Sequence, residues 1–201
     1  DLFVLSDEIY ERITYGTTHV PLASLPGLYD RTITVSGFSK AYSMTGWRLG
    51  YVAAPSSVVD PIIRARQYTS TCANSFAQHG GVRALRERET LVPPLVDAFE
   101  ERRDALVDRI DAVPGMTCPE PQGAFYAFPN IGELLGSSYN GKKIDTCQQF
   151  AQTLIEDFGV AAVPGAPFGA DGFLRLSYAV HDDEMKKGLE RLADFASALQ
   201  D

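Results

Sequence analysis

Two apolar runs of strand type are each followed at once by polar side chains, and this pattern constrains the fold more than any other feature of the chain. The run Leu2 to Leu5 leads into the segment SDEIYE, which carries Asp7 and Tyr10. The run Thr32 to Ser36 leads into the segment GFSKAYSMTGWRLGY, which carries Lys40. Apolar runs of this kind are typical of buried parallel strands, whose carboxyl ends meet at the ligand-binding edge of an open sheet. The sequence therefore predicts an α/β fold with these polar residues at one edge.

The residue types in these segments suit the polar atoms of pyridoxal phosphate. A lysine that attacks an aldehyde reacts in its neutral form, and the rest of the product must be held by other groups. Asp7 provides a carboxylate for the pyridine nitrogen, Tyr10 a phenol for the ring oxygen and Arg48 a guanidinium for the phosphate. A single charged residue is usually a solvated surface group. Because these residues follow strand-like runs, the set predicts a pyridoxal phosphate site around Lys40.

The segment from Gly37 to Gly50 resembles the lysine signature of the class I and II aminotransferases, the pyridoxal phosphate enzymes of fold type I that include aspartate aminotransferase. The positions that match are Gly37, Phe38, Ser39, Lys40, Ser43, Met44, Gly46, Arg48, Leu49 and Gly50. The downstream runs PQGAFYAFPN, GVAAVPGAPFG and FLRLSYA also resemble this family. The similarity therefore extends over nearly the whole chain.

The resemblance implies a role for each matching residue. Lys40 would bind the cofactor covalently and move the proton at the substrate α-carbon. Asp7, as a buried carboxylate, would keep the pyridine nitrogen protonated, Tyr10 would donate to the ring oxygen, and Arg48 would bind the phosphate. Arg175, in FLRLSYA, would bind the substrate α-carboxylate through a two-pronged salt bridge. The alternative for Arg175 is a strand arginine that pairs with a surface acid.

The resemblance implies transfer of an amino group between an amino acid and a 2-oxo acid by a ping-pong mechanism. Aspartate is the favoured donor, because the segment from Ser36 to Tyr51 looks like the aspartate aminotransferase branch, while alanine and aromatic donors remain open. Tyr10 favours amino transfer, since related acyltransferases carry a histidine at this position. Two alternatives stay open: a pyridoxal phosphate-dependent lyase or decarboxylase of the same fold, and an inactive fragment that lacks the amino-terminal half.

Family members carry a long segment ahead of the first strand, so the chain resembles the carboxyl-terminal part of such an enzyme. Residues 1–93 would be the end of a large, mainly parallel-sheet cofactor-binding domain. Residues 94–201 would comprise a bridging helix and a small α+β domain. Groups expected in the preceding segment include a phosphate-binding helix terminus and an aromatic residue that stacks on the cofactor ring. If no companion polypeptide supplies these groups, we expect this chain alone to bind pyridoxal phosphate poorly.

Hydrophobic periodicity and turn residues predict the remaining elements. Helices are expected over Asp60 to Thr71, over Phe76 to Arg88, after Pro93 and Pro94 as far as Val113, from Asp145 onwards, and over Met185 to Leu199. Asp60 is expected as the cap of the first of these, with Pro61 at its first position. Asp145 and Gln148 are expected to form a capping box. Strands are expected over Leu49 to Ala53, Met116 to Cys118, Ala124 to Phe128, Val160 to Val163 and Phe173 to Ser177. The polar stretch Ser137 to Lys143 is expected to be an exposed linker.

Composition narrows the possible partners and the compartment. The net charge of −8 argues against binding to nucleic acid or to an anionic membrane, and no apolar stretch is long enough to span a bilayer. Three widely spaced cysteines without a C-x-x-C pair argue against a disulfide framework or a zinc site, so a reducing cytoplasm fits best. The resemblance also implies a homodimer acting on amino acid and 2-oxo acid substrates.

The histidines give no sign of a metal site. His19, His79 and His181 are widely dispersed, and no metal is expected. His181 is expected at the start of the last helix, and the other two receive no role.

Overall fold

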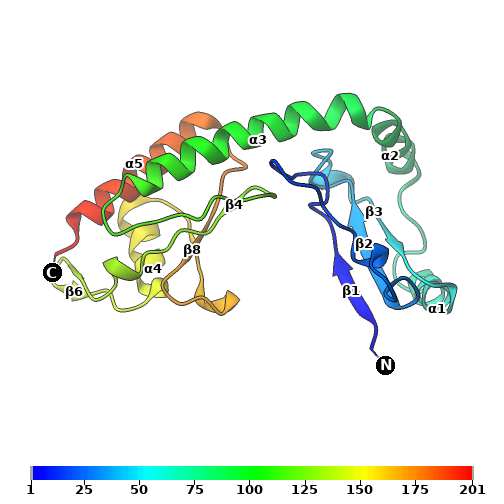
Figure 1. The fold of residues 1–201 in the computed structure, drawn as a ribbon, viewed down its shortest axis with the longest axis horizontal. Helices are drawn as coiled ribbons and strands as arrows, with labels where there is room; N and C mark the ends of the chain where they lie inside the picture. Colours follow the sequence, from blue (N-terminus) through cyan, green and yellow to red (C-terminus); the bar gives the residue numbers. More distant parts are fainter. Residues whose placement is uncertain (1, 201) are drawn as a thin grey trace. The chain divides into compact units, whose positions relative to one another are not determined.

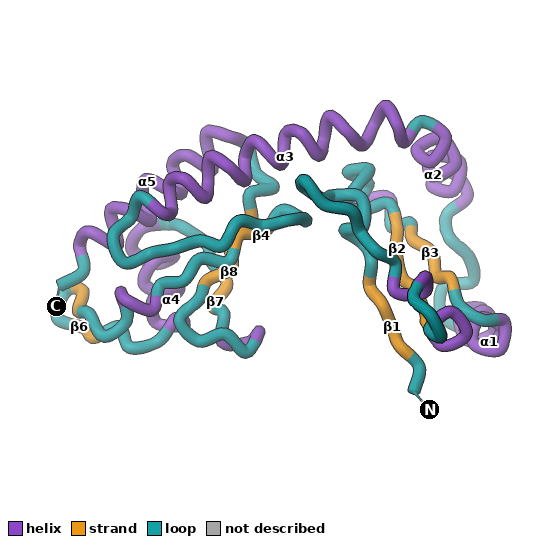
Figure 2. Tube along the Cα trace, viewed as in Figure 1, coloured by secondary structure: helices purple, strands orange, loops and turns teal. Residues whose placement is uncertain are grey.

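A computed structural model describes residues 2–200 of the chain, and Figures 1 and 2 show the course of its helices and strands. The chain forms two compact units, Asp1–Asp97 and Ala98–Asp201. The division falls inside helix α3 (Arg88–Asp111), four residues beyond the boundary that the sequence suggested. The other elements of the first unit are β1 (Val4–Asp7), β2 (Thr32–Gly37), β3 (Gly50–Ala53), α1 (Ser56–Gln67), α2 (Ser75–Arg86) and the 3₁₀ turns η1 (Leu22–Ser24), η2 (Tyr29–Arg31) and η3 (Thr45–Trp47).

The first unit is built on a three-stranded sheet of order β1-β2-β3, visible in Figure 1. Strands β1 and β2 are parallel, with Val4 opposite Thr32 and Asp7 opposite Val35. Strand β3 is antiparallel to β2. The expected parallel pairing therefore holds for β1 and β2 but not for β3, because the chain returns directly through the loop 38–49 without a crossover helix.

The loop 38–49 is closed by its own hydrogen bonds and by an apolar cluster. Phe38 N donates to Leu49 O at 3.2 Å, and Met44 N donates to Phe38 O at 3.3 Å. Phe38, Met44 and Leu49 are buried together with Ala84 of α2. Helix α2 packs closely at Gly81, where an added methyl group would lie 2.6 Å from Leu49 Cδ2. The loop is thus a packed part of the unit and can hold its polar side chains in place.

The prolines do not start their helices where the sequence suggested. Helix α1 begins at Ser56 and contains Pro61 in its interior, and α3 begins at Arg88 ahead of Pro93 and Pro94. A proline inside a helix removes one backbone hydrogen bond. All three prolines lie on exposed positions, so water can bind the carbonyls that lose their partner. The predicted start at Asp60 is therefore wrong.

The second unit has a central three-stranded sheet of order β4-β8-β7. Its elements after α3 are β4 (Tyr126–Ala127), η4 (Gly132–Leu134), β5 (Ser138–Tyr139), β6 (Lys142–Lys143), α4 (Cys147–Phe158), β7 (Val163–Pro164), η5 (Ala166–Phe168), β8 (Leu174–Ser177) and α5 (Asp182–Ala198). Strands β5 and β6 form a hairpin where an exposed linker was expected, because Asn140 and Gly141 both adopt the positive φ that a tight hairpin turn needs. Residues 116–118 contribute only an isolated bridge from Thr117 to Asn130.

The sequence placed the start of α4 one residue early and placed His181 correctly at the start of α5. The capping box of α4 consists of Thr146 and Gln149, one residue beyond the predicted pair: Gln149 N donates to Thr146 Oγ1 at 3.2 Å, and Thr146 N donates to Gln149 Oε1 at 3.2 Å. The two candidate pairs have the same spacing, so spacing alone could not separate them. His181 lies at the start of α5 as predicted, and it also caps the helix, because its Nδ1 accepts a hydrogen bond from Asp183 N at 3.4 Å.

The three cysteines are unpaired: Cys72 is exposed, whereas Cys118 and Cys147 are buried. Burial raises the pKa of the Cys118 thiol to about 11. No helix within residues 2–200 is long and apolar enough to cross a membrane. The same residues contain no group of three or more His, Cys, Asp or Glu side chains placed to hold a metal ion.

Gly37 at the end of β2 and Gly50 at the start of β3 are paired and lie very close together. A methyl group on Gly37 would lie 2.9 Å from Gly50 Cα and 3.0 Å from Leu49 O. We therefore expect Gly37→Ala to lower the free energy of unfolding by about 1–3 kcal/mol, because the strands must separate to admit it. Chemical denaturation measures this change. Gly46→Ala is the matched control, since an added methyl there meets nothing within 4 Å. Equal stability of the two variants would contradict the prediction.

Candidate active site

Lys40 and Tyr10 meet beside the carboxyl ends of β1 and β2. Lys40 lies shortly after Gly37, the last residue of β2, and Tyr10 lies shortly after Asp7, the last residue of β1. The parallel pairing of the strands places both segments at one edge of the sheet. The Lys40 Nζ atom lies 5.8 Å from the centre of the Tyr10 ring. An amine and a phenol from distant parts of the chain are thus close neighbours.

The packed loop fixes the backbone around Lys40. Ser43 N donates to Lys40 O at 3.2 Å, and Ser43 itself adopts a positive φ of 52°. Ala41, the next residue, is buried, whereas the Lys40 side chain is half-buried. The main chain is therefore held by the core, while the Lys40 side chain is only partly covered.

Asp7 is the last residue of β1, and its side chain is exposed in the structure of residues 2–200. The expectation that Asp7 is a buried carboxylate is therefore wrong for this part of the protein. The Asp7 Oδ1 atom accepts a hydrogen bond from Ile9 N at 3.3 Å. Successive side chains of an extended segment point to opposite sides. Because Glu8 points inward, Asp7 points outward.

Arg48 lies in the same loop as Lys40, just before β3. Its side chain is exposed, and its Nη1 atom donates to Thr45 O at 2.8 Å. The residue adopts φ 52° and ψ 47°, a left-handed conformation that costs a non-glycine residue roughly 1–2 kcal/mol. The neighbouring Leu49 is buried in the cluster with Phe38. The guanidinium and the Lys40 amine are therefore carried by one packed loop.

Arg175 belongs to the second unit, where it lies close to two aromatic rings. In β8 the flanking Leu174 and Leu176 are buried on one face of the sheet. Neighbouring side chains of a strand point to opposite faces, so Arg175 points to the other face. Tyr126 of β4 pairs with Ser177 and is thus the diagonal neighbour of Arg175. The Arg175 Cζ atom lies 4.7 Å from the centre of the Tyr126 ring and 4.8 Å from that of the Phe168 ring. The Arg175 guanidinium is thus close to two aromatic rings from other elements.

Among residues 2–200, no carboxylate forms an ion pair with Arg175. Its side chain is half-buried. A partly desolvated guanidinium is stabilised by an anion, and its donors suit a carboxylate held by two parallel hydrogen bonds. Arg175 can therefore bind a ligand carboxylate. From the sequence, Phe168 was expected to line the substrate side-chain pocket, but its closeness to Arg175 and that of Tyr126 were not foreseen, although strand alternation could have pointed to Tyr126.

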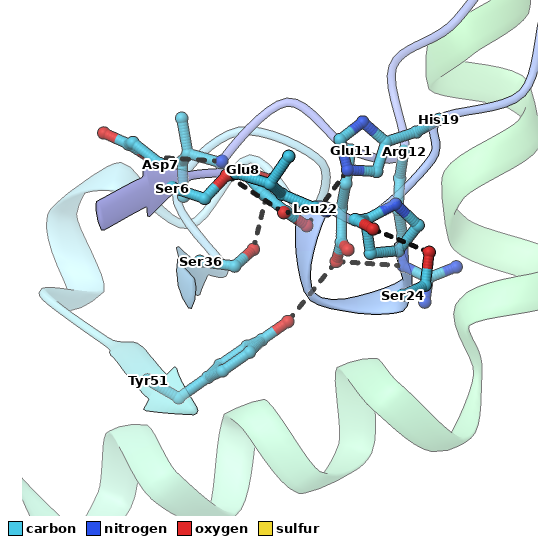
Figure 3. A network of polar contacts seen from close by, with 12 residues as sticks. Ser6, Asp7, Glu8, Glu11, Arg12, His19, Leu22, Ser24, Ser36 and Tyr51 are labelled. Atoms are coloured by element: carbon cyan, nitrogen blue, oxygen red, sulfur yellow. Dashed lines mark hydrogen bonds and ion pairs between the residues drawn. The ribbon is translucent and has the colours of Figure 1, made fainter. Parts of the chain in front are cut away.

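A buried carboxylate that the sequence analysis also missed lies next to Asp7. Glu8 is only 5% exposed and accepts three hydrogen bonds, drawn in Figure 3. Its Oε1 atom accepts from Leu22 N and Ser6 Oγ, each at 3.0 Å, and its Oε2 atom lies 3.0 Å from His19 Nε2. His19, which received no role from the sequence, is therefore the partner of Glu8.

The hydrogen bonds keep Glu8 ionised in spite of its burial. Burial alone would raise the pKa of the carboxyl group, but the hydrogen bonds from Leu22 N, His19 and Ser6 outweigh it and hold the pKa below the ordinary 4.5. Glu8 is therefore a charged group that ties the segment around Leu22 to the end of β1.

The first unit thus carries an amine, a phenol, a carboxylate and a guanidinium on the segments that leave its sheet. Lys40, Tyr10, Asp7 and Arg48 provide these groups, and their chemistry fits pyridoxal phosphate. The fold and this set of groups together point to the α/β enzymes that use this cofactor.

The comparison with protein families agrees. The family model described as Aminotransferase class I and II matches residues 1–192, so the chain belongs to the class I and II aminotransferase family. The resemblance seen in the sequence is thereby confirmed. Members of this family use pyridoxal phosphate.

Relatives with established names support the same assignment. The aspartate aminotransferase of Rhizobium meliloti (strain 1021) is 40% identical over 195 residues, which are 96% of this chain and 48% of the relative. A crystal structure described as that of the aspartate aminotransferase from Rhizobium meliloti matches with a TM-score of 0.95 at 39% identity, over 98% of this chain and 50% of that one. The aromatic aminotransferase from Pyrococcus horikoshii OT3 matches with a TM-score of 0.86 at 36% identity, over 98% and 51% of the respective chains. The chain therefore spans about half the length of these relatives.

The charge of Glu8 should make stability depend on pH. A carboxyl group whose pKa is lower in the folded state stabilises the fold at pH values above 4.5, and this contribution is lost as the pH falls through the folded-state pKa. We therefore expect Glu8→Gln to lower the free energy of unfolding at neutral pH, with a difference from the wild type that narrows in acid. Denaturation at a series of pH values measures this difference. A difference that stays constant with pH would contradict the prediction.

Proposed function

We propose that the complete protein is a pyridoxal phosphate-dependent aminotransferase that moves an amino group between an amino acid and a 2-oxo acid. The observation that carries this proposal is the position of Lys40, whose amine lies over the Tyr10 ring beside two parallel strand ends. Membership of the class I and II aminotransferase family supports it. The proposal concerns the complete protein because the chain spans about half the length of its relatives.

Each group of the first unit has a task in this reaction. Pyridoxal phosphate, when bound, supplies an electron sink for the negative charge that develops at the substrate α-carbon. Lys40 removes the proton from that carbon and returns one to the cofactor side. Asp7 holds a proton on the pyridine nitrogen, and Tyr10 donates a hydrogen bond to the ring oxygen. Arg48 binds the phosphate through its donor fork.

Arg175 would bind the α-carboxylate that every amino acid and 2-oxo acid substrate carries. The closeness of its guanidinium to the Tyr126 and Phe168 rings supports this role, because neighbouring rings restrict the side chain and two parallel hydrogen bonds to a carboxylate need a defined orientation. A substrate held in this way presents one chosen bond for reaction.

Aspartate is our first choice as amino donor. The aspartate aminotransferase name of the Rhizobium meliloti relative supports this choice. The aromatic aminotransferase name of the Pyrococcus horikoshii structure keeps aromatic donors open. We further propose that the enzyme is a cytoplasmic homodimer, and that the first unit is the end of a large cofactor-binding domain followed by a small carboxyl-terminal domain.

Removal of the Lys40 amine should abolish amino transfer. We expect Lys40→Ala to lower the rate of 2-oxo acid formation by at least roughly 10²- to 10⁴-fold, the range typical for loss of a general acid–base group. Lys142→Ala, at an exposed lysine of β6, is the control and should retain the wild-type rate. Unchanged activity of Lys40→Ala would refute the proposal. If the wild-type enzyme released carbon dioxide or another fragment of the substrate and formed no 2-oxo acid, the result would indicate the lyase alternative.

Half-reactions of the complete enzyme with aspartate, alanine and phenylalanine test the substrate assignments. We expect aspartate to react fastest. Arg175→Lys should lower kcat/KM for all three donors by roughly 10- to 100-fold, because lysine keeps the charge but loses the paired hydrogen bonds. A wild type that reacts no faster with aspartate than with the others would reject the aspartate preference. An Arg175→Lys variant with unchanged kcat/KM would reject carboxylate binding by Arg175.

A further inference from the structure

The backbone of Glu8 joins the two segments of the candidate site. Its N–H group donates to Val35 O of β2 at 2.8 Å. Its carbonyl oxygen accepts from Glu11 N at 3.0 Å and from the buried Ser36 Oγ at 3.3 Å. These bonds connect the turn after β1 with the strand that leads to Lys40. Glu8 is directly bonded to Asp7 and precedes Tyr10 in the same turn.

The side chain of Glu8 extends the connection to a third segment. Its two oxygens receive hydrogen bonds from Ser6 of β1, from His19 and from the amide of Leu22 at the start of η1 (Figure 3). Burying a carboxylate is costly unless several donors compensate, and loss of one donor leaves the charge poorly satisfied. The position of the turn is therefore coupled to the segment 17–24. Small displacements of groups that contact a ligand cause large losses of function.

We infer that Glu8 is a positioning residue that, by linking the end of β1 to the segment 17–24, holds Asp7 and Tyr10 in the geometry required for the cofactor. The inference rests on the proposed function. Glu8 points away from Asp7, so it acts through the backbone and through its neighbours rather than by touching the cofactor.

Two variants weaken the link in different ways. Glu8→Gln removes the negative charge and replaces one of the two acceptor oxygens with an NH₂ donor. Leu22→Pro removes the amide donor and leaves Glu8 intact. Proline suits this position, because Leu22 is the first residue of η1 and Pro21 before it has φ −59° and ψ 132°, values compatible with a following proline. Glu11→Gln is the matched control: this nearby carboxylate contacts Tyr51 and Arg12 and makes no side-chain hydrogen bond to the segment 17–24 among residues 2–200.

The experiment uses the complete protein, freed of cofactor and titrated with pyridoxal phosphate. We expect both Glu8→Gln and Leu22→Pro to raise the dissociation constant of the cofactor roughly tenfold, the effect of one lost hydrogen bond to a charged group. We also expect them to shift the pH midpoint of the visible absorbance of the bound cofactor. Glu11→Gln should leave both quantities unchanged. If Glu8→Gln fails to fold, Leu22→Pro alone decides.

The remaining outcomes overturn the inference in distinguishable ways. Wild-type affinity and midpoint in Glu8→Gln and Leu22→Pro, with only a lower free energy of unfolding, would show that Glu8 is purely structural. A shifted midpoint in Glu8→Gln with wild-type values in Leu22→Pro would assign the effect to lost charge rather than to position. Failure of the wild-type protein to bind pyridoxal phosphate would overturn the proposed function itself.

Discussion

The parallel pairing of β1 with β2 is the interaction on which the candidate site depends. It sets Asp7 opposite Val35 and thereby places the turn after β1 beside the segment after β2. Lys40 and Tyr10 come together only because these two strand ends share an edge of the sheet. A shift of the register by one residue would turn every side chain of β1 to the other face, exchanging the inward Glu8 with the outward Asp7.

The loop 38–49 converts this edge into a defined site. Its apolar residues Phe38, Met44 and Leu49 pack with α2, so the loop behaves as part of the core. Left-handed backbone at Ser43 and Arg48 is tolerated within this packed setting. The side chains that could contact a ligand are thus carried by a segment whose main chain has little freedom. This combination explains how a loop can hold an amine and a guanidinium in fixed positions.

Much of the fold could be predicted, and the errors have physical causes. Strand β2 and helix α2 were located to within two residues at each end, β2 from its strand-like run of residues. The start of α1 was misplaced because Pro61 can be accommodated on an exposed helix face. The capping box of α4 was assigned one residue early because Asp145 and Thr146 are both good caps with a glutamine at the same spacing. In both cases the local sequence was compatible with more than one helix start, and packing in the folded chain decides between them.

The chemical groups that follow each strand could be identified from the sequence, since the lysine signature and strand-like runs are local features of the chain. How those groups are supported became clear from the folded structure. Burial of Glu8 among three donors depends on the segment around Leu22, and the aromatic surroundings of Arg175 depend on Tyr126 and Phe168, which come from other elements. Contacts between residues far apart in the chain arise from strand pairing and packing, and a local pattern carries no information about the partner that folding will bring near.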